Sequence, residues 1–225
     1  GVGCGADMPG DVGVEEGSPV EPGTELMAVT SSTHNLLRAE RPALNAVSHL
    51  SGIATATRAW VAAVANTDAG IRDTRKTTPG LRGVEKYAVR VGGGLNHRMN
   101  LADAALVKDN HVEALGGVDE AFRAVRRVFP EIPIEVEVDT LEQLDVAIDA
   151  GADLILLDNF SVEEMAEAVR RTSGRALLEA SGGLTLDQAA AVAATGVDYL
   201  AVGALTHSSP VLDIGADLTV VSEES

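Results

Sequence analysis

The sequence contains a single cysteine, Cys4, and is short of positive charge, with 17 lysine and arginine residues against 34 acids and a formal net charge of −17. One cysteine cannot form a disulfide within the chain. The acidic balance argues against nucleic acid as a main partner, because a phosphate backbone requires a broad basic surface. No run of 18 apolar residues and no charged-then-apolar leader occurs, so we expect a cytoplasmic protein without a membrane partner.

Several familiar site motifs are also missing. The sequence has no cluster of histidine and cysteine, no glycine fingerprint of a nucleotide-binding fold and no convincing nucleophile triad. Its 225 residues, 45% of them hydrophobic, suffice for one large α/β domain, alone or with a small appendage. The first 26 residues form no complete domain by pattern, and we expect that part of a natural N-terminal domain precedes them.

Positive charge is concentrated in one segment. All three lysines lie between Asp73 and His111, and residues 72–108 hold eight of the 17 basic residues against three acids, a local charge of +5. A cationic pocket in an anionic protein suits a small polyanion, because low-dielectric walls strengthen each contact. We predict that this segment forms the active site.

The pattern of apolar residues changes along the chain. Residues 14–26 suggest two strands joined by tight turns, and residues 35–65 suggest two or three helices, interrupted near Pro42 and Gly52. From Gly70 onward, short apolar strands alternate with amphipathic helices, which is typical of parallel βα units. The predicted strands cover residues 70–73, 104–108, 132–138, 154–157, 176–179 and 199–202, and capping boxes are predicted at Thr140 with Gln143, Ser161 with Glu164 and Thr185 with Gln188.

Polar and glycine residues follow these strands. In a closed barrel all the carboxyl ends of the strands face one mouth, where barrel active sites lie, whereas a doubly wound open sheet uses only the ends next to its switch point. Every predicted strand from 104–108 onward ends in such residues, so we favour a parallel α/β barrel. The residues concerned are Lys108, Glu137, Asp139, Asp158, Ser181–Gly183 and Gly203.

The sharpest constellation combines Arg75, Lys76, His97, Arg98 and Lys108. Guanidinium groups grip carboxylates with paired hydrogen bonds and lysine adds a point charge, so the set suits a ligand with two carboxylates. The alternative is a solvated basic face. We favour a site, because prolines, glycines and a buried-looking strand separate these charges.

Glycines and acids at the strand ends suggest a second ligand. Gly92–Gly94, Ser181–Gly183 and Gly203 are candidate phosphate cradles, because glycine lets backbone amides approach an anion. Glu137, Asp139 and Asp158 offer hard oxygens suited to Mg²⁺ or to ribose hydroxyls. Asp139 has an alternative role as a helix cap.

Long motifs give the sequence a resemblance to a known family. The segments DTRKTTPGLR, EKYAV, GGGLNHR, LVKDNH, EVEVDTLEQL, LILLDNF, LEASGG and DYLAVGALTHS, in this order between residues 40 and 213, resemble quinolinate phosphoribosyltransferase, the decarboxylating nicotinate-nucleotide pyrophosphorylase. The resemblance implies an N-terminal α/β open sandwich, a seven-stranded TIM-like α/β barrel, and dimers. One barrel strand is then not placed by the pattern. We expect a partial sandwich domain over residues 1–40, completed by about 209–225, and a barrel domain over residues 41–208.

The resemblance also implies an activity. The reaction would be phosphoribosyl transfer from phosphoribosyl pyrophosphate to quinolinate with decarboxylation, giving nicotinate mononucleotide, pyrophosphate and CO₂ for NAD biosynthesis (EC 2.4.2.19). A homodimer or higher homo-oligomer with a shared active site is implied, with Mg²⁺ as cofactor.

The resemblance assigns roles to individual residues. The family's quinolinate ligands match Arg75, Lys76, His97, Arg98 and Lys108, with Arg41 resembling the arginine from the neighbouring subunit. The acids that hold ribose and Mg²⁺ match Glu137 and Asp158, and the phosphate loops match Ser181, Gly182 and Gly203. We expect catalytic roles for Lys76, Lys108, Glu137 and Asp158.

Two other readings stay open. A class I aldolase-type lyase would use Lys76 or Lys108 as a Schiff base at the barrel mouth. A non-catalytic paralogue would bind phosphoribosyl ligands without turnover.

Overall fold

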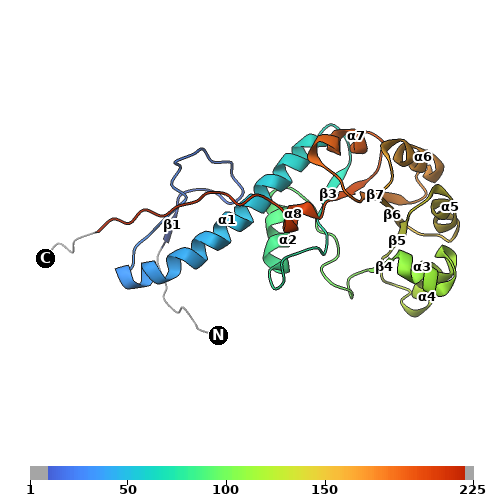
Figure 1. Ribbon diagram of the computed structural model, residues 1–225, viewed down its shortest axis with the longest axis horizontal. Helices are drawn as coiled ribbons and strands as arrows, with labels where there is room; N and C mark the ends of the chain where they lie inside the picture. The colour runs from blue at the N-terminus through green and yellow to red at the C-terminus, as the bar shows by residue number, and fades with distance from the viewer. Residues whose placement is uncertain (1–9, 221–225) are drawn as a thin grey trace.

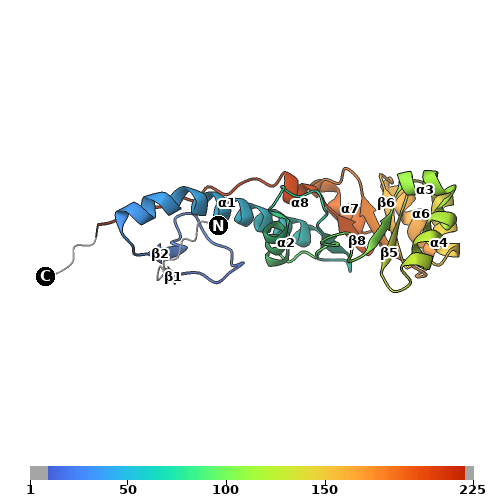
Figure 2. The same ribbon diagram turned by 90° about the horizontal axis from the view of Figure 1, so that it is seen from below.

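A computed structural model describes residues 10–220 of the chain. A long helix with a small two-stranded sheet beside its N-terminal half leads into an α/β barrel, and the two ends of the described chain lie near that sheet (Figure 1). The same elongated arrangement is seen from below in Figure 2. No helix among the described residues is long and apolar enough to cross a membrane.

The small sheet pairs β1 (Gly10–Val12) with β2 (Met27–Val29) in antiparallel fashion. We expected strands within residues 14–26, and this expectation was wrong, because that stretch is the connection between β1 and β2. Two turns follow one another in it, closed by hydrogen bonds from Ser18 to Glu15 and from Thr24 to Glu21. Gly17 and Gly23 take positive φ angles of 76° and 84°, which leaves no extended run for a ladder.

Helix α1 (Thr33–Ala63) is one continuous helix, begun by the Ser32 side chain, which accepts a hydrogen bond from Asn35. The breaks predicted near Pro42 and Gly52 were therefore wrong. Gly52 is required by packing, since an added Cβ would lie 2.1 Å from the carbonyl oxygen of Pro210 in the extended C-terminal segment. Pro42 removes one helical N–H without ending the helix. The boundary expected between residues 40 and 41 falls inside α1, and the division into domains stays a prediction.

A six-stranded, all-parallel sheet forms the barrel wall in the order β3-β8-β7-β6-β5-β4. The predicted α/β barrel is thus confirmed, and all six predicted strands are present with ends shifted by a few residues. The strands are β3 (Gly70–Arg72), β4 (Ala105–Val107), β5 (Ile134–Val138), β6 (Leu154–Asp158), β7 (Leu177–Ser181) and β8 (Tyr199–Ala201). The helices are α2 (Arg82–Val91), α3 (Asp109–Leu115), α4 (Val118–Val128), α5 (Leu141–Asp149), α6 (Val162–Thr172), the 3₁₀ helix η1 (Leu186–Gln188), α7 (Ala189–Ala193) and α8 (Ala204–His207).

The remaining barrel position is occupied by a single bridging residue. Leu95 pairs in parallel with Arg72, on the side of β3 away from β8. Its N–H donates to Ile71 at 2.7 Å and its carbonyl accepts from Asp73 at 3.1 Å. Residues around Leu95 therefore stand where a seventh strand would lie, between β3 and β4.

The predicted helix starts are partly confirmed. Ser161 and Glu164 form a complete capping box at α6. Thr140 caps α5, but the Gln143 side chain reaches the N–H of Asp139. The box at Thr185 was wrong, because a 3₁₀ turn begins there and the Thr185 hydroxyl bonds to the Gln188 side chain.

The apolar core lies between the sheet and the surrounding helices. Alternate strand residues such as Val136, Ile155 and Leu200 face outward and are fully buried against helix residues such as Leu144 and Met165. The other strand residues face the interior of the barrel. That interior includes several charged residues, and the carboxyl ends of the strands surround its mouth.

Candidate active site

Several strands carry charged side chains at positions that face inward, so these side chains meet inside the barrel. On β5 the inward residues are Glu135 and Glu137, and on β7 they are Glu179 and Ser181. Arg72 of β3 completes the lower layer, where its Nη1 donates to Glu179 at 2.6 Å. A barrel interior is usually filled with branched apolar residues, so this one is built for polar contacts.

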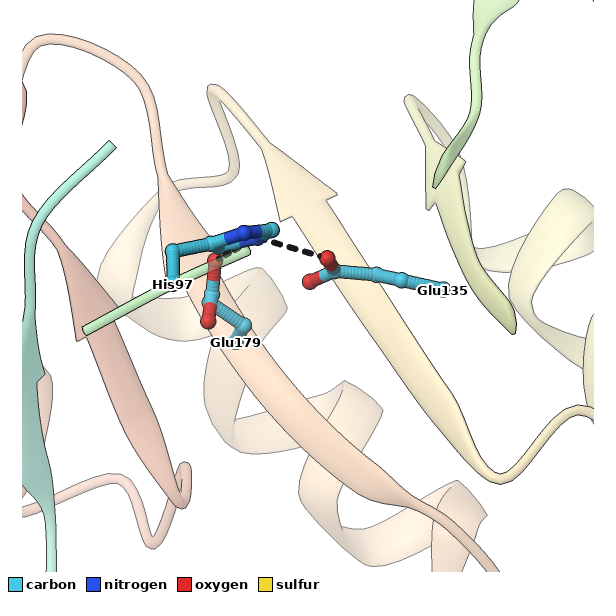
Figure 3. Close-up of side chains that lie close together, drawn as sticks. All are labelled: His97, Glu135 and Glu179. Atoms are coloured by element: carbon cyan, nitrogen blue, oxygen red, sulfur yellow. Dashed lines mark ion pairs between the residues drawn. The ribbon is translucent and has the colours of Figure 1, made fainter. Parts of the chain in front are cut away.

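His97 lies between two buried glutamates. Its Nε2 is 2.7 Å from Glu135 Oε2 and 3.5 Å from Glu179 Oε1, and the three side chains point toward one another from different segments (Figure 3). Its Nδ1 accepts a 2.7 Å hydrogen bond from the backbone N–H of Arg98. The proton of neutral His97 therefore sits on Nε2 and is donated to Glu135.

The buried surroundings of Glu179 change the pKa of its carboxyl group. Burial, together with the negative charge of Glu135, raises the pKa of Glu179 to about 7. His97 and Arg72 act in the opposite direction. One oxygen on each glutamate, Oε1, is buried without a hydrogen-bond partner.

His97, Glu135 and Glu179 are close enough to share a metal ion, since their ligand atoms lie within 4.8 Å of one another. The hydrogen bonds of His97 argue against a metal site here. Binding through Nε2 would require the proton on Nδ1, where it would face the N–H of Arg98. Arg72 also already balances charge at Glu179. We read the cluster as a hydrogen-bonded network that orients His97.

Two loops bring the predicted cations to this interior. Arg75 and Lys76 follow β3, and His97 and Arg98 follow the Leu95 bridge beside it. Arg98 Nη1 donates to the carbonyl of Ala104 at 3.0 Å. The Nε atoms of Arg75 and Arg98 are buried and have no hydrogen-bond partner among the described residues. Unpaired buried donors are costly, so this pair fits an anionic ligand.

The charge of Arg98 is only partly compensated. Burial lowers the pKa of Arg98 and the neighbouring charge of Arg75 lowers it further, whereas Glu135 raises it. Two guanidinium groups held near each other in this way favour a ligand that brings negative charge.

Glu137 and Asp158 lie on the neighbouring strands β5 and β6, and Lys108 directly follows the next strand, β4, as the N-cap residue of α3. Lys108 Nζ is 2.6 Å from Glu137 Oε2, with the Lys108 side chain 46% exposed and that of Glu137 10% exposed. Glu137 is paired with Leu156, two residues before Asp158, so both acids face the same side of the sheet. These carboxylates are the kind of oxygen donors that Mg²⁺ takes together with substrate phosphates and waters.

The predicted phosphate loops follow the next two strands of the sheet, β7 and β8, and Ser181 is the strand partner of Asp158. Gly182 takes a φ of 95°, and an added Cβ would lie 2.2 Å from the Asn159 side-chain oxygen. Asn159 in turn donates to Asp158 at 2.8 Å, and its backbone N–H donates to the carbonyl of Ser181. Gly203 packs against Lys76, whose Cδ would lie 3.1 Å from a Cβ at this glycine. The loops after β6 and β7 thus contact each other closely, and the loop after β8 contacts Lys76.

Arg41 is not brought to the mouth of its own barrel. It lies on the exposed half of α1, where it pairs with Glu40 at 3.6 Å. It lines a hollow of about 370 Å³ between α1 and the C-terminal segment, with His49 and Asp213 among the other lining residues. Its role at a neighbouring subunit stays a prediction.

Some basic residues of the predicted cationic segment do not face a ligand. Lys86 is fully buried and forms an ion pair with Asp73. Arg90 stacks at 5.6 Å on the ring of Tyr87 outside the barrel. The +5 charge counted from the sequence therefore overstates the charge at the mouth.

Sequence reasoning missed the lower layer of the site. Arg72, Glu135 and Glu179 were not predicted to belong to it, nor were Asp73 and Lys86 as partners. The available signal was an acid inside a short apolar strand, as in the segments IEVEV and LLEAS.

Comparisons with known proteins agree with this site. The family model described as "Quinolinate phosphoribosyl transferase, C-terminal domain" matches residues 53–217, and the corresponding N-terminal domain model matches residues 4–51. A nicotinate-nucleotide pyrophosphorylase [carboxylating] of Mycobacterium leprae is 60% identical over 208 residues, covering 91% of this chain and 73% of the relative. The human protein of that name is 42% identical over 209 residues, covering 90% of this chain and 70% of the relative.

Solved structures show the same relationship. NadC from Streptococcus pyogenes superposes with a TM-score of 0.88 at 41% identity, covering 92% of this chain and 74% of the other. The nicotinate-nucleotide pyrophosphorylase from Ehrlichia chaffeensis superposes with a TM-score of 0.90 at 38% identity, covering 92% and 76%. This chain belongs to the quinolinate phosphoribosyltransferase family.

Proposed function

We propose that this protein transfers the phosphoribosyl group of phosphoribosyl pyrophosphate to quinolinate and releases CO₂. The observation that carries the proposal is the pair of buried Nε donors on Arg75 and Arg98, which have no partner among the described residues. Quinolinate is a pyridine with two adjacent carboxylates, and each guanidinium can grip one of them. Lys76, His97 and Lys108 complete the quinolinate site.

The phosphoribosyl donor binds next to quinolinate in this proposal, along the ends of strands β5 to β8. Glu137 and Asp158 hold the ribose hydroxyls, because carboxylates accept hydrogen bonds from a diol. Ser181, Gly182 and Gly203 receive the phosphates through backbone amides, which glycine leaves accessible. The contact between Lys76 and Gly203 supports a common site, since it links the two halves of the mouth.

Glu137 and Asp158 are also the residues we propose for Mg²⁺. Their hard oxygens, on one face of neighbouring strands, fit an ion that keeps several waters and binds substrate phosphates. When bound, the ion neutralises charge on the pyrophosphate leaving group.

The reaction then follows from positioning and charge. The pyridine nitrogen attacks the anomeric carbon of the ribose as the bond to pyrophosphate breaks, and nearby carboxylates stabilise the positive charge that develops there. The pyridinium formed accepts the electron pair of the breaking C–C bond as the carboxylate next to the nitrogen leaves as CO₂. A proton then takes its place on the ring carbon, which gives nicotinate mononucleotide.

Neither alternative reading is favoured by a specific contact. A Schiff-base lysine must lose its proton, whereas Lys108 is held as an ion pair by Glu137, and the Lys76 side chain packs against Gly203. A binding-only paralogue has no need of the full set of acids and cations that this mouth retains.

We also propose a homodimer or higher homo-oligomer in which Arg41 reaches the neighbouring barrel. Its exposed position on α1, outside its own barrel mouth, supports such a role. A shared site would make turnover depend on assembly.

The test is release of CO₂ from quinolinate labelled in the carboxyl group next to nitrogen. Phosphoribosyl pyrophosphate and Mg²⁺ are each omitted in turn, and the expected result is release only when all are present. A folded, assembled protein that releases no CO₂ and forms no nicotinate mononucleotide contradicts the transferase assignment and favours the binding-only reading.

A further inference from the structure

Helix α2 fastens the two loops that carry the proposed quinolinate cations. Residues 73–79 form the first loop, with Arg75 and Lys76, and residues 94–99 form the second, with His97 and Arg98. Three charged residues in the first turns of α2 hydrogen-bond to these loops, and we call them the α2 anchor: Arg82, Glu85 and Lys86.

Lys86 has the largest side chain among the fully buried residues that the structure describes. Its Nζ forms an ion pair with Asp73, which is also fully buried, and donates to the carbonyl of His97 at 2.8 Å. Asp73 accepts from the backbone N–H of His97 at 2.8 Å and from the Asn96 side chain at 2.6 Å. The buried pair thus holds the peptide groups on both sides of the His97 side chain.

The other two members of the anchor hold the first loop. Glu85 is fully buried, accepts from the N–H of Thr78 at 3.0 Å and lies 2.9 Å from Nε2 of His49 on α1. Arg82 donates to the Thr77 hydroxyl at 3.0 Å and to the Arg75 carbonyl at 3.3 Å. Both loops are therefore positioned from one rigid helix.

A stabilising role alone is weak grounds for the Lys86–Asp73 pair. Burial disfavours the charged form of Lys86 and lowers its pKa, whereas Asp73 raises it. Buried ion pairs can often be replaced by apolar residues of similar size without loss of stability. An apolar pair at these positions could not hold the N–H and the carbonyl of His97, so the contact to the loop is what distinguishes Lys86 and Asp73.

We infer that Lys86 and Asp73 are positioning residues for quinolinate, which fix the loop carrying His97 and Arg98 without touching the substrate. The inference rests on the proposed function. Phosphoribosyl pyrophosphate is bound in that proposal by residues of β5 to β8, none of which contacts the α2 anchor through a hydrogen bond among the described residues. Loss of the anchor should therefore weaken quinolinate binding selectively.

The first variant is Lys86→Met, which keeps the length of the side chain and removes its donor. We expect the KM for quinolinate to rise about 10-fold to 100-fold, because small displacements of a binding group have effects of this size, with the KM for phosphoribosyl pyrophosphate changed less than about threefold. A double variant, Asp73→Asn with Lys86→Met, removes both charges. It should regain thermal stability relative to the single variant and keep the raised KM, because methionine cannot donate to the His97 carbonyl.

Leu144→Ala is the control for general destabilisation. Leu144 is fully buried on α5, away from both loops, so its truncation should lower the melting temperature and leave the ratio of the two KM values unchanged. If Lys86→Met does not fold, Asn96→Ala tests whether this hydrogen-bonded network positions the loop that carries His97 and Arg98. It removes the hydrogen bonds from Asn96 to Asp73 and to the Lys86 carbonyl at a partly exposed position.

Calorimetric titration with quinolinate separates this inference from the proposed function. A wild-type protein that neither binds nor turns over quinolinate contradicts the function itself. A wild-type protein that does both, with folded Lys86→Met or Asn96→Ala binding quinolinate as tightly, overturns the positioning role alone. Equal increases in both KM values would also overturn it, because they indicate a general structural effect.

Discussion

The imidazole Nε2 of His97 lies 2.7 Å from Glu135 Oε2 in the barrel interior. Because His97 Nδ1 accepts from the Arg98 N–H, this nitrogen carries the proton, and Glu135 fixes the plane of the ring. The same carboxylate lies near enough to Arg98 to stabilise its charge. Glu135 therefore supports both His97 and Arg98, two of the proposed quinolinate ligands, from within the barrel.

Glu135→Ala should lower kcat/KM for quinolinate by about 5-fold to 150-fold, because a buried donor left without an acceptor costs roughly 1–3 kcal/mol. Glu135→Gln is the matched variant, since its amide oxygen can still accept from His97, and its loss should be smaller. Steady-state kinetics with both substrates measures the difference. Equal activity of Glu135→Ala and the wild type would show that His97 needs no such support.

Arg98→Ala should weaken quinolinate use more strongly. Removing the guanidinium leaves a desolvated carboxylate of the substrate unpaired, at a cost of about 2–4 kcal/mol, which corresponds to roughly 30-fold to 1,000-fold in kcat/KM. Arg127→Ala, on the outer side of α4, is the control and should retain wild-type kinetics. A decrease of less than about threefold for Arg98→Ala would remove this residue from the site.

The strands were predictable because each combines a short apolar run with polar residues at its end. The roles of Glu135 and Glu179 in the site were not predictable, since an acid inside a strand also suits a face exposed to solvent. Only closure of the sheet turns that face inward. Lys86 was counted in the positive charge of the segment 72–108, because the sequence alone does not show that Asp73 neutralises it.

The errors near the N-terminus have a different origin. Gly52 looked like a helix break, but it is a point of close approach to Pro210, 158 residues later in the chain by their numbering. The Leu95 bridge was missed because one residue gives no periodicity. Both features are set by tertiary contacts, which local propensity does not contain.

Stability should fall as the pH rises from about 4.5 to about 7, owing to Glu179. Burial and Glu135 raise its pKa in the folded state to about 7, above its ordinary value of 4.5. The folded protein therefore binds the proton of Glu179 more tightly than the unfolded chain does. The resulting contribution to the free energy of unfolding is fully present below about pH 4.5, decreases as the pH rises, and is lost above about pH 7. The slope reaches at most about 1.4 kcal/mol per pH unit.

Urea unfolding at several pH values between 5 and 8.5 tests this sign. Glu179→Gln cannot ionise at this position, so its free energy of unfolding should fall less steeply over the same range. Parallel curves for the two proteins would contradict the assignment of this pH dependence to Glu179.

Gly182→Ala should raise the KM for phosphoribosyl pyrophosphate. The added methyl group would lie 2.2 Å from the Asn159 side-chain oxygen, so it would displace Asn159 and with it the contact to Asp158. Gly151→Ala is the matched control, because that glycine also has a positive φ, 87°, but it lies between α5 and β6, away from the mouth, and a methyl group added there would have nothing within 4 Å of it. The prediction fails if the two variants have the same KM values.

Mixing two inactive variants tests whether Arg41 acts across subunits. The Arg41→Ala chain lacks the residue that would enter the active site of the neighbouring subunit. The Lys108→Ala chain lacks a residue of the active site in its own barrel. In a mixed dimer one of the two sites would combine an intact Lys108 with an intact Arg41 from the other chain. Random exchange of subunits in a two-fold dimer should then restore about one quarter of wild-type activity.

The outcome distinguishes the two possible geometries. If Arg41 served its own barrel, every site in the mixture would lack either Arg41 or Lys108, and activity would not return. Unfolding and refolding the variants together, with each refolded alone as a control, ensures that exchange has occurred. Recovery of activity only in the mixture is expected, since Arg41 lies on the exposed part of α1, outside the mouth of its own barrel.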